Sequence, residues 1–337
     1  MSPTQGHLEI RYRAGAARKL SSPCRLCPRR CGVDRLSGER GYCGAGPDPK
    51  VAAVVPHFGE EPPLTGTFGA GTVFFSHCNL RCVYCQNYQI SQQHLGQEIT
   101  PDALALEFLK LQAAGCANID MVSPGHHLPG ALEALAIAVE EGLSLPVIYN
   151  TNAYEAPEAL ELLDGIVDVY LPDLKYASDT LAARYSDVTD YVAIARNAVL
   201  TMYRQVGDFV LDAHGRAQRG LIVRHLILPR NLVNTRETLK WLRANLPLTV
   251  PISLMSQFNP LHRSQEFPEL DRCITEKEYD EMIDFAWELG LENVFIQEMD
   301  SPCIAVPDFT LQQPFRWDRE HPDSAVGEGA RYGNENL

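Results

Sequence analysis

Three cysteines close together in the sequence have the spacing of a metal-binding loop. Cys78, Cys82 and Cys85 lie within eight residues. Three thiolates can hold three corners of a compact iron–sulfur cluster, but an ordinary four-iron cluster takes four thiolates. One iron would therefore keep a position open for an outside ligand, as catalytic zinc sites do. Two alternatives remain: a zinc loop with a fourth ligand such as His77, or three thiols that are only buried.

A second group of four cysteines lies near the N-terminus, at Cys24, Cys27, Cys31 and Cys43. Four thiolates complete a coordination sphere, so this group predicts a closed site that holds either zinc or an iron–sulfur cluster. A disulfide framework is typical of short secreted chains, and this chain is long and shows no secretory signal. The arginines around the group would either lower the thiolate pKa values or form a solvated basic surface.

The elements that must position these residues alternate between strands and helices. Short apolar runs predict strands at 71–76, 119–123, 146–150, 166–171, 221–228, 250–255 and 293–297. Helical patterns lie near 101–114, 129–142, 156–163, 189–205, 234–245 and 275–289. This alternation, with nearly continuous apolar strands, predicts an α/β fold in which helices flank a parallel sheet. The stretch from 51 to 300 has the length of a (β/α) barrel, about 250 residues.

Four parts are expected along the chain of 337 residues. They are a flexible arm at 1–20, a Cys-rich metal-binding segment at 21–50, the barrel at 51–300 and a C-terminal extension at 301–337. The composition, 45 % hydrophobic and 21 % charged, is typical of globular proteins. The formal net charge of −14 disfavours nucleic acid and anionic membranes as partners. No apolar run reaches the roughly 20 residues of a membrane span, so a cytoplasmic location is expected.

Polar residues follow the predicted strands where each strand ends. Ser123, Asn150, Asn152, Asp173 and Lys175 are placed in this way. The carboxyl ends of parallel strands converge on one face, where barrel enzymes have their active sites. We therefore expect these residues at the barrel mouth, although some would only cap loops. Five histidines would either gather there, where one could relay protons, or be structural: His57, His77, His126, His127 and His225.

The region around the three cysteines resembles a known family. The pattern Cys-x-x-x-Cys-x-aromatic-Cys, with Tyr84 as the aromatic residue, is similar to the motif of radical S-adenosylmethionine (SAM) enzymes. Further segments resemble a subgroup of uncharacterised iron–sulfur proteins related to the pyruvate formate-lyase activating enzyme, at 57–63, 66–87, 170–176, 224–229 and 255–258. The resemblance implies a partial, TIM-like (β/α) barrel of the radical SAM type.

The resemblance also implies roles for individual residues. Cys78, Cys82 and Cys85 would hold a four-iron (4Fe–4S) cluster whose open iron takes the amino and carboxylate groups of SAM. Lys175, in the Asp173-x-Lys175 pair, would face the SAM carboxylate, unless the two residues form only a surface ion pair.

Three further residues would contact other parts of SAM. Tyr84 would lie beside the adenine, unless it only shields the cluster. Asn150 and Asn152 would contact the ribose or the methionine part, with loop capping as the alternative.

Two features depart from the activating enzymes. Those enzymes usually carry Gly-Gly-Glu after the second strand, where it holds the SAM amino group, but this chain has Ser123-Pro124-Gly125-His126. Backbone carbonyls or Ser123 would have to make that contact. In addition, the four-cysteine group precedes the radical SAM motif here, whereas extra clusters of activating enzymes follow it.

The implied activity is that of a radical SAM oxidoreductase, which cleaves SAM reductively and abstracts hydrogen from a substrate. Its partners would be a low-potential electron donor, such as flavodoxin or ferredoxin, and a protein or peptide substrate. By resemblance, that substrate is a glycyl-radical enzyme. A second hypothesis is a radical SAM enzyme that acts on another peptide or a small molecule. A third is a non-catalytic iron–sulfur electron carrier, which would lack a SAM pocket.

Overall fold

The computed structural model describes residues 3–299 and 306–315. The main sheet contains β1 (Lys50–His57), β2 (Ala70–Phe75), β3 (Gln97–Glu98), β4 (Ile119–Val122), β5 (Val147–Thr151), β6 (Val169–Pro172), β7 (Val210–Leu211) and β8 (Ala217–Leu221). A second, smaller sheet contains β9 (Val223–Leu226), β10 (Ile252–Met255) and β11 (Val294–Ile296).

The helices alternate with these strands, as the sequence predicts. They are α1 (Pro3–Lys19), α2 (Pro62–Thr65), α3 (Tyr88–Ser91), α4 (Pro101–Ala113), α5 (Leu128–Glu140), α6 (Pro157–Glu161), α7 (Asp179–Ser186), α8 (Tyr191–Val206), α9 (Leu232–Asn245) and α10 (Glu276–Glu288). Local signals fix several of their starts. Thr100 caps α4, and Thr275 forms a reciprocal capping box with Glu278 at the start of α10.

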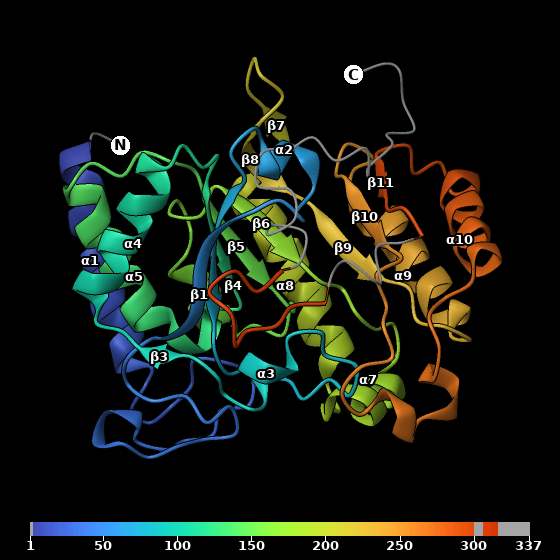
Figure 1. Cartoon of the computed structure of the whole chain (residues 1–337), viewed down its shortest axis with the longest axis horizontal. Helices are drawn as coiled ribbons and strands as arrows, with labels where there is room; N and C mark the ends of the chain where they lie inside the picture. The colour runs from blue at the N-terminus through green and yellow to red at the C-terminus, as the bar shows by residue number, and fades with distance from the viewer. Residues whose placement is uncertain (1–2, 300–305, 316–337) are drawn as a thin grey trace.

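The strands form a partial barrel, which confirms the predicted fold class. β2, β4, β5 and β6 pair in parallel, and so do β9, β10 and β11. A parallel bridge between Asp173 and Arg224 connects the two sets. β1 adds to β2 in antiparallel orientation, with the two-residue β3 on its other side, and its alternating burial indicates that one face is covered. Figure 1 shows the helices around the outside of this open barrel.

The run 221–228, predicted as one strand, is divided between the two sheets. β8 runs beside β6, and the Ile222 amide still donates to Tyr170 O at 3.1 Å. The Val223 amide donates instead to Pro251 O at 3.0 Å, so that β9 pairs with β10. The division depends on the strand that each half pairs with, β6 for β8 and β10 for β9. An unbroken apolar run in the sequence does not indicate such a change of partner.

The expected flexible arm is wrong: residues 3–19 form the helix α1, which packs along α5. Its contact face contains the buried residues Ile10, Ala14 and Ala17. These residues recur at helical spacing, and two of them are alanines. The stripe is too small to stand out in the sequence. It becomes stable only because α5 is itself largely apolar and offers a matching surface.

The two ends of the barrel differ. In Figure 1, α2 lies at the end that also carries β7 and β8, where Leu64 packs among inward-facing residues such as Ile148 and Leu171. The Cys-rich segment, α3 and α7 lie at the opposite end, at the carboxyl ends of the parallel strands. From the C-terminal extension, Phe309 and Phe315 pack on β1 and β2.

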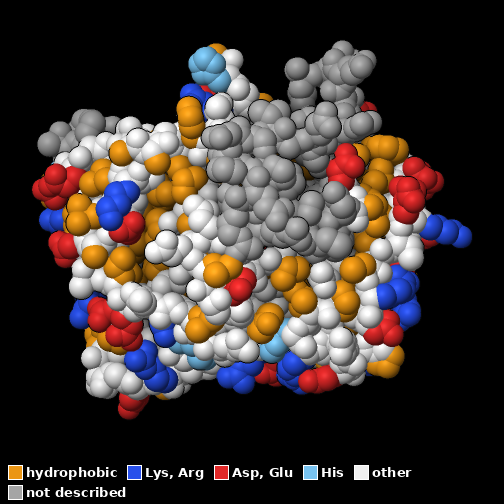
Figure 2. Space-filling model, in the orientation of Figure 1, with side chains coloured by type: hydrophobic (Ala, Val, Ile, Leu, Met, Phe, Trp, Pro, Cys, Tyr) orange, Lys and Arg blue, Asp and Glu red, His pale blue; other side chains and the backbone are white. Residues whose placement is uncertain are grey.

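On the face shown in Figure 2, acidic and basic side chains are interspersed around the edge, and no single-sign patch stands out. Within the described parts of the chain, no helix combines the length and apolar character that crossing a membrane requires.

Candidate functional site

The three-cysteine loop leaves the sheet at the end of β2. His77 adopts a left-handed backbone (φ 73°), which turns the chain out of the strand. Cys82 is buried, Cys78 and Cys85 are partly buried, and all three are free thiols. The loop is held from outside, because the Val83 amide donates to Tyr185 O at 2.8 Å.

Each of the three sulfurs has a polar partner. The Leu80 amide and the Asn152 side-chain amide both donate to Cys78 Sγ, each at 3.4 Å. Ser186 Oγ donates to Cys82 Sγ at 3.0 Å, and Ser91 Oγ lies 3.3 Å from Cys85 Sγ. Hydrogen bonds to ligand sulfurs are among the features that set the potential of iron–sulfur clusters. The donor set therefore fits a cluster held by three cysteines.

The pKa values of these thiols are raised when no metal is bound. Burial raises the pKa of Cys78 to about 12 and that of Cys85 to about 11, and the neighbouring Cys82 adds to both shifts. The free thiols would therefore keep their protons at neutral pH. Thiolates form here only if a cation such as iron replaces the protons, which is the usual coupling between metal binding and proton release.

Tyr84 is buried, and its hydroxyl belongs to a chain that leads back to the cysteines. Its oxygen lies 2.6 Å from the Tyr176 hydroxyl, which lies 2.6 Å from Ser186 Oγ, the partner of Cys82. Its ring packs on Phe258 with centroids 5.7 Å apart. This arrangement orients the loop, and a contact between Tyr84 and an adenine stays a prediction.

Asp173 and Lys175 lie together after β6. Lys175 Nζ donates to Asp173 Oδ2 at 2.6 Å, and the side chains are only 15 % and 23 % exposed for Lys175 and Asp173, so this is no solvated surface pair. Burial alone would lower the pKa of Lys175, but the charges of Asp173 and Cys82 outweigh burial and raise it. The ammonium therefore stays charged. Because it has three donors and this bond uses one, it can also bind a ligand carboxylate.

A small cavity adjoins the three-cysteine loop. Its volume is about 10 Å³, and it is lined by Asn79, Ser123, Gly125, His126, Thr151, Asn152 and Glu155. Asn152 connects it to the loop, because its side-chain amide donates both to Cys78 Sγ and to Asn79 Oδ1 at 2.8 Å. Asn150 is not among the residues that line this cavity, and its side chain lies near enough to Asp120 to influence the pKa of that carboxyl group. The structure thus brings Ser123 and Asn152 together, but not Asn150.

The N-terminal cysteines are gathered by tight turns. The Arg30 amide donates to Cys27 O and the Gly32 amide to Cys24 O, both at 3.1 Å. Cys43 lies near enough to Cys24, Cys27 and Cys31 to interact electrostatically with them.

Backbone amides point at three of these sulfurs. The Tyr42 amide donates to Cys31 Sγ at 3.3 Å, and the amides of Arg29 and Ala45 lie near enough to Cys27 and Cys43 to lower the pKa values of those thiols. Across residues 3–299 and 306–315, no three His, Cys, Asp or Glu side chains converge as ligands of one metal ion. The cysteines of an iron–sulfur cluster need not converge on one ion in this way, because each of them binds a separate iron.

The Cys-rich segment packs directly on the three-cysteine loop. Arg29 Nε donates to Asn79 O at 3.0 Å, and the Arg81 guanidinium donates to Tyr42 O at 3.2 Å. The Tyr42 ring lies against both guanidiniums, whose carbons are 3.7 and 4.2 Å from its centroid. Its hydroxyl donates to Asp187 Oδ2 at 2.7 Å. The two cysteine groups are therefore parts of one continuous structure.

The histidines cluster only in part. His77 stacks on His94, with centroids 4.3 Å apart, and His126 and His127 both direct Nε2 at Ser76 O, at 2.7 and 3.1 Å. Burial lowers the pKa of His77 to about 4 and that of His126 to about 3, so both are neutral at physiological pH. These contacts favour the structural interpretation. The other two lie elsewhere, at His57 and His225.

The sequence does not assign one buried ion group inside the barrel. Arg224 Nε donates to Glu61 Oε1 at 2.9 Å, and its Nη2 contacts both Glu60 and Glu61. Burial and the charge of Glu60 raise the pKa of Asp120 well above its usual range. The signal was present, because a charged residue within an apolar strand, such as Arg224 or Asp120, must find a partner inside the fold.

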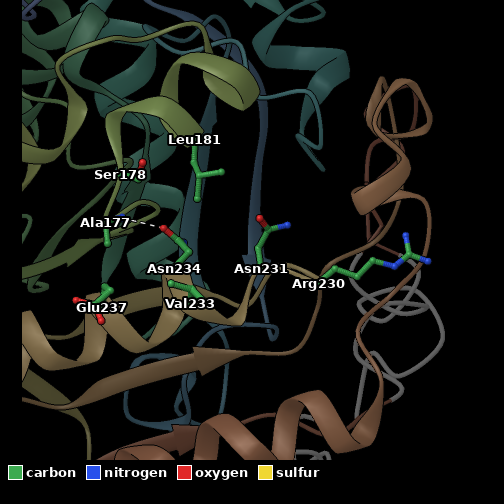
Figure 3. Close-up of a pocket in the computed structure, with 8 residues that line it drawn as sticks. All are labelled: Ala177, Ser178, Leu181, Arg230, Asn231, Val233, Asn234 and Glu237. Carbon is green, nitrogen blue, oxygen red and sulfur yellow. Dashed lines mark hydrogen bonds between the residues drawn. The ribbon is translucent and has the colours of Figure 1, made fainter.

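An open cavity of about 370 Å³ lies between the loop after β6 and the start of α9 (Figure 3). It is lined by Ala177, Ser178, Leu181, Arg230, Asn231, Val233, Asn234 and Glu237. The Asn234 side chain accepts a bond from the Ala177 amide at 2.8 Å and donates to Lys175 O at 2.9 Å. The wall of this cavity therefore fixes the backbone that carries Lys175.

Part of this chain, including the three-cysteine loop, is similar to a known family. Residues 72–209 match the family model described as the radical SAM superfamily. The uncharacterized protein MJ0674 of Methanocaldococcus jannaschii is 29 % identical over 290 residues, which cover 83 % of this chain and 78 % of MJ0674. MJ0808 of the same organism is 28 % identical over 176 residues, which cover 46 % of this chain and 50 % of MJ0808.

Solved structures with some similarity include SuiB of Streptococcus suis. Its complex with the precursor peptide SuiA has a TM-score of 0.48 at 10 % identity and covers 70 % of this chain and 50 % of SuiB. Its complex with SAM has a TM-score of 0.48 at 11 % identity and covers 67 % of this chain and 50 % of SuiB. The radical SAM methyltransferase TsrM of Kitasatospora setae, with tryptophan and a SAM analogue, has a TM-score of 0.41 at 12 % identity, over 56 % of this chain and 36 % of TsrM.

Proposed function

We propose that this chain, a member of the radical SAM superfamily, is an oxidoreductase that binds SAM at a 4Fe–4S cluster and abstracts hydrogen from a substrate. The three-cysteine loop carries the proposal, because its sulfurs sit at the carboxyl end of the sheet and each has a hydrogen-bond partner. When bound, the reduced cluster and SAM together supply the radical chemistry.

The residues of the chain hold and orient these groups. Cys78, Cys82 and Cys85 would bind three irons and leave the fourth to SAM. Lys175 would bind the SAM carboxylate, with its position fixed by Asp173 and by the Asn234 contacts to the loop backbone. No side chain is required as an acid, base or nucleophile.

We also propose that Cys24, Cys27, Cys31 and Cys43 hold a second metal centre, and of structural zinc and a saturated iron–sulfur cluster we favour the cluster, because its ligands bind separate irons. The backbone amides directed at their sulfurs support it. Metal and sulfide analysis of a variant with alanine at positions 78, 82 and 85 tests it. That variant keeps the metal of the N-terminal group, and a metal-free, folded variant would contradict the proposal.

For the substrate we propose a polypeptide, with a glycyl-radical enzyme as the first candidate, in keeping with the sequence resemblance. The substrate would approach beside the open cavity of about 370 Å³ next to the Lys175 loop. Electrons would come from flavodoxin or ferredoxin in the cytoplasm, the reducing compartment that free cysteines suit. With deuterated substrate, label would pass into 5′-deoxyadenosine. Transfer of deuterium into 5′-deoxyadenosine from a small molecule, and from no polypeptide, would contradict the proposal of a polypeptide substrate.

Reductive cleavage of SAM by reconstituted protein tests the activity itself. The wild type should form 5′-deoxyadenosine under anaerobic conditions, whereas Cys82→Ala should form none. Cys116→Ala is the matched control, because Cys116 is a buried cysteine outside the three-cysteine loop whose thiol donates to Phe68 O at 3.8 Å. Equal product from Cys82→Ala and the wild type would refute the proposed function.

A further inference from the structure

A buried carboxylate with an unused oxygen lies beside the three-cysteine loop. Glu155 follows β5 and is only 4 % exposed. Its Oε1 accepts a hydrogen bond from Thr151 Oγ1 at 2.5 Å, whereas Oε2 has no hydrogen-bond partner among the described residues. The Tyr149 hydroxyl is near enough to affect the carboxyl, but it does not reach Oε2 with normal bond geometry. A buried acceptor left without a partner is costly, by about 1–3 kcal/mol.

No basic side chain neutralises Glu155. It forms none of the ion pairs found in the described parts of the chain, and no basic group is among the causes that shift its pKa. Burial raises that pKa to about 7, the ordinary response of a carboxyl group without a cation.

Glu155 lines the small cavity described above, and its unused oxygen lies close to Gly125, which lines the same cavity. A Cβ at Gly125 would lie 2.8 Å from Glu155 Oε2, so only glycine at this position leaves the approach to the carboxylate open. Ser123, two residues earlier, has a left-handed backbone (φ 56°) that turns the chain away from β4. The cavity of about 10 Å³ holds one group of the size of water, which is also the size of an ammonium.

The chemistry of this cavity selects its occupant. A carboxylate oxygen without a donor pairs best with a charged N–H donor, and such bonds are about twice as strong as neutral ones. Asn152 lines the cavity and also donates to Cys78 Sγ. An ammonium in the cavity would therefore be separated from the cluster ligand Cys78 only by the Asn152 side chain. SAM has one primary ammonium, its α-amino group, and its carboxylate is assigned to Lys175.

We propose that Glu155 binds the α-amino group of SAM, an inference that rests on the proposed function. The chain has no acidic residue at Ser123-Pro124-Gly125-His126 after β4. Glu155 instead supplies the carboxylate from the loop after the neighbouring strand β5. Its Oε2 lies beside Gly125, the glycine of that Ser-Pro-Gly-His stretch.

Binding of two ligands to anaerobically reconstituted protein tests the assignment. The first is S-adenosylhomocysteine, and the second is the same thioether without its α-amino group. Glu155→Gln should weaken binding of S-adenosylhomocysteine by about 10- to 100-fold, the loss of one charge-assisted bond, and leave the second ligand unchanged. Glu161→Gln, an exposed carboxylate on α6, should leave both affinities unchanged.

A second variant approaches the cavity from its other side. Gly125→Ala keeps the carboxylate but places a methyl group 2.8 Å from Oε2, so it should also weaken S-adenosylhomocysteine selectively. Iron content and far-UV circular dichroism establish that each variant is folded. If both variants weaken binding of the two ligands equally, or if neither variant weakens binding of either ligand, the assignment of Glu155 is wrong while the proposed function stands. If the wild type binds neither ligand, the proposed function itself fails.

Discussion

Replacing Arg224 with methionine tests the buried ion group inside the barrel. Arg224 contacts both Glu60 and Glu61, and the three side chains are 10 %, 8 % and 7 % exposed, in that order. Methionine fills most of the same volume but leaves two buried carboxylates without their cation. Breaking a buried pair in this way costs about 3–5 kcal/mol. We therefore expect Arg224→Met to lower the free energy of unfolding by about that amount at neutral pH.

The loss should depend on pH. Burial alone would raise the pKa of Glu61, but Arg224 outweighs burial and holds that pKa below its ordinary value. A lowered pKa in the folded state stabilises the fold above the unfolded value, about 4.3 for glutamate, and this contribution disappears as the pH falls through the folded value. The wild type and Arg224→Met should therefore differ most at neutral pH and converge as the pH falls below about 4.

Urea denaturation at several pH values measures both effects. Arg263→Met is the matched control, because Arg263 and its partner Glu266 are 51 % and 54 % exposed, and loss of such a pair costs at most about 1 kcal/mol. Adding Glu61→Gln to Arg224→Met should restore part of the stability, because one unpaired charge is removed. Equal losses in Arg224→Met and Arg263→Met would refute the reasoning.

Two more predictions concern the contacts of the three-cysteine loop. Ser186→Ala removes the hydroxyl donor to Cys82, so the reduction potential of the loop cluster should fall in a redox titration, and an unchanged potential would show that this bond does not reach a cluster ligand. Tyr42→Leu removes the ring between Arg29 and Arg81, so it should lower the free energy of unfolding by about 1–3 kcal/mol and speed proteolysis of the Cys-rich segment. Tyr12→Leu, at an exposed site, should change neither the stability nor the rate of proteolysis.

Local patterns in the sequence predict much of the site. The spacing of Cys78, Cys82 and Cys85 and their place after an apolar strand indicate the loop, and the rule that strand ends converge brings Ser123 and Asn152 beside it. Asp173 and Lys175 form a largely buried ion pair after a strand end, and the expected contact of Lys175 with the SAM carboxylate stays a prediction. These features depend on residues close together in the chain or on the general geometry of parallel sheets.

Other features depend on contacts between distant segments, which a single sequence does not reveal. The stacking of Tyr42 on Arg81 joins the Cys-rich segment to the three-cysteine loop, although β1 and β2 separate the two segments in the sequence. Glu155 meets Gly125 only because β4 and β5 are neighbours in this sheet. α1 was missed for the same reason, because its small apolar face is stable only against α5.

The most direct test of the central claim is whether SAM binds at the loop cluster. Electron paramagnetic resonance spectra of anaerobically reduced protein would be recorded before and after addition of SAM. We predict that SAM changes the spectrum of the wild type and has no effect on Cys82→Ala. A wild-type spectrum that SAM leaves unchanged, with iron and sulfide contents that show an intact cluster, would contradict the account and favour an electron carrier with a closed cluster.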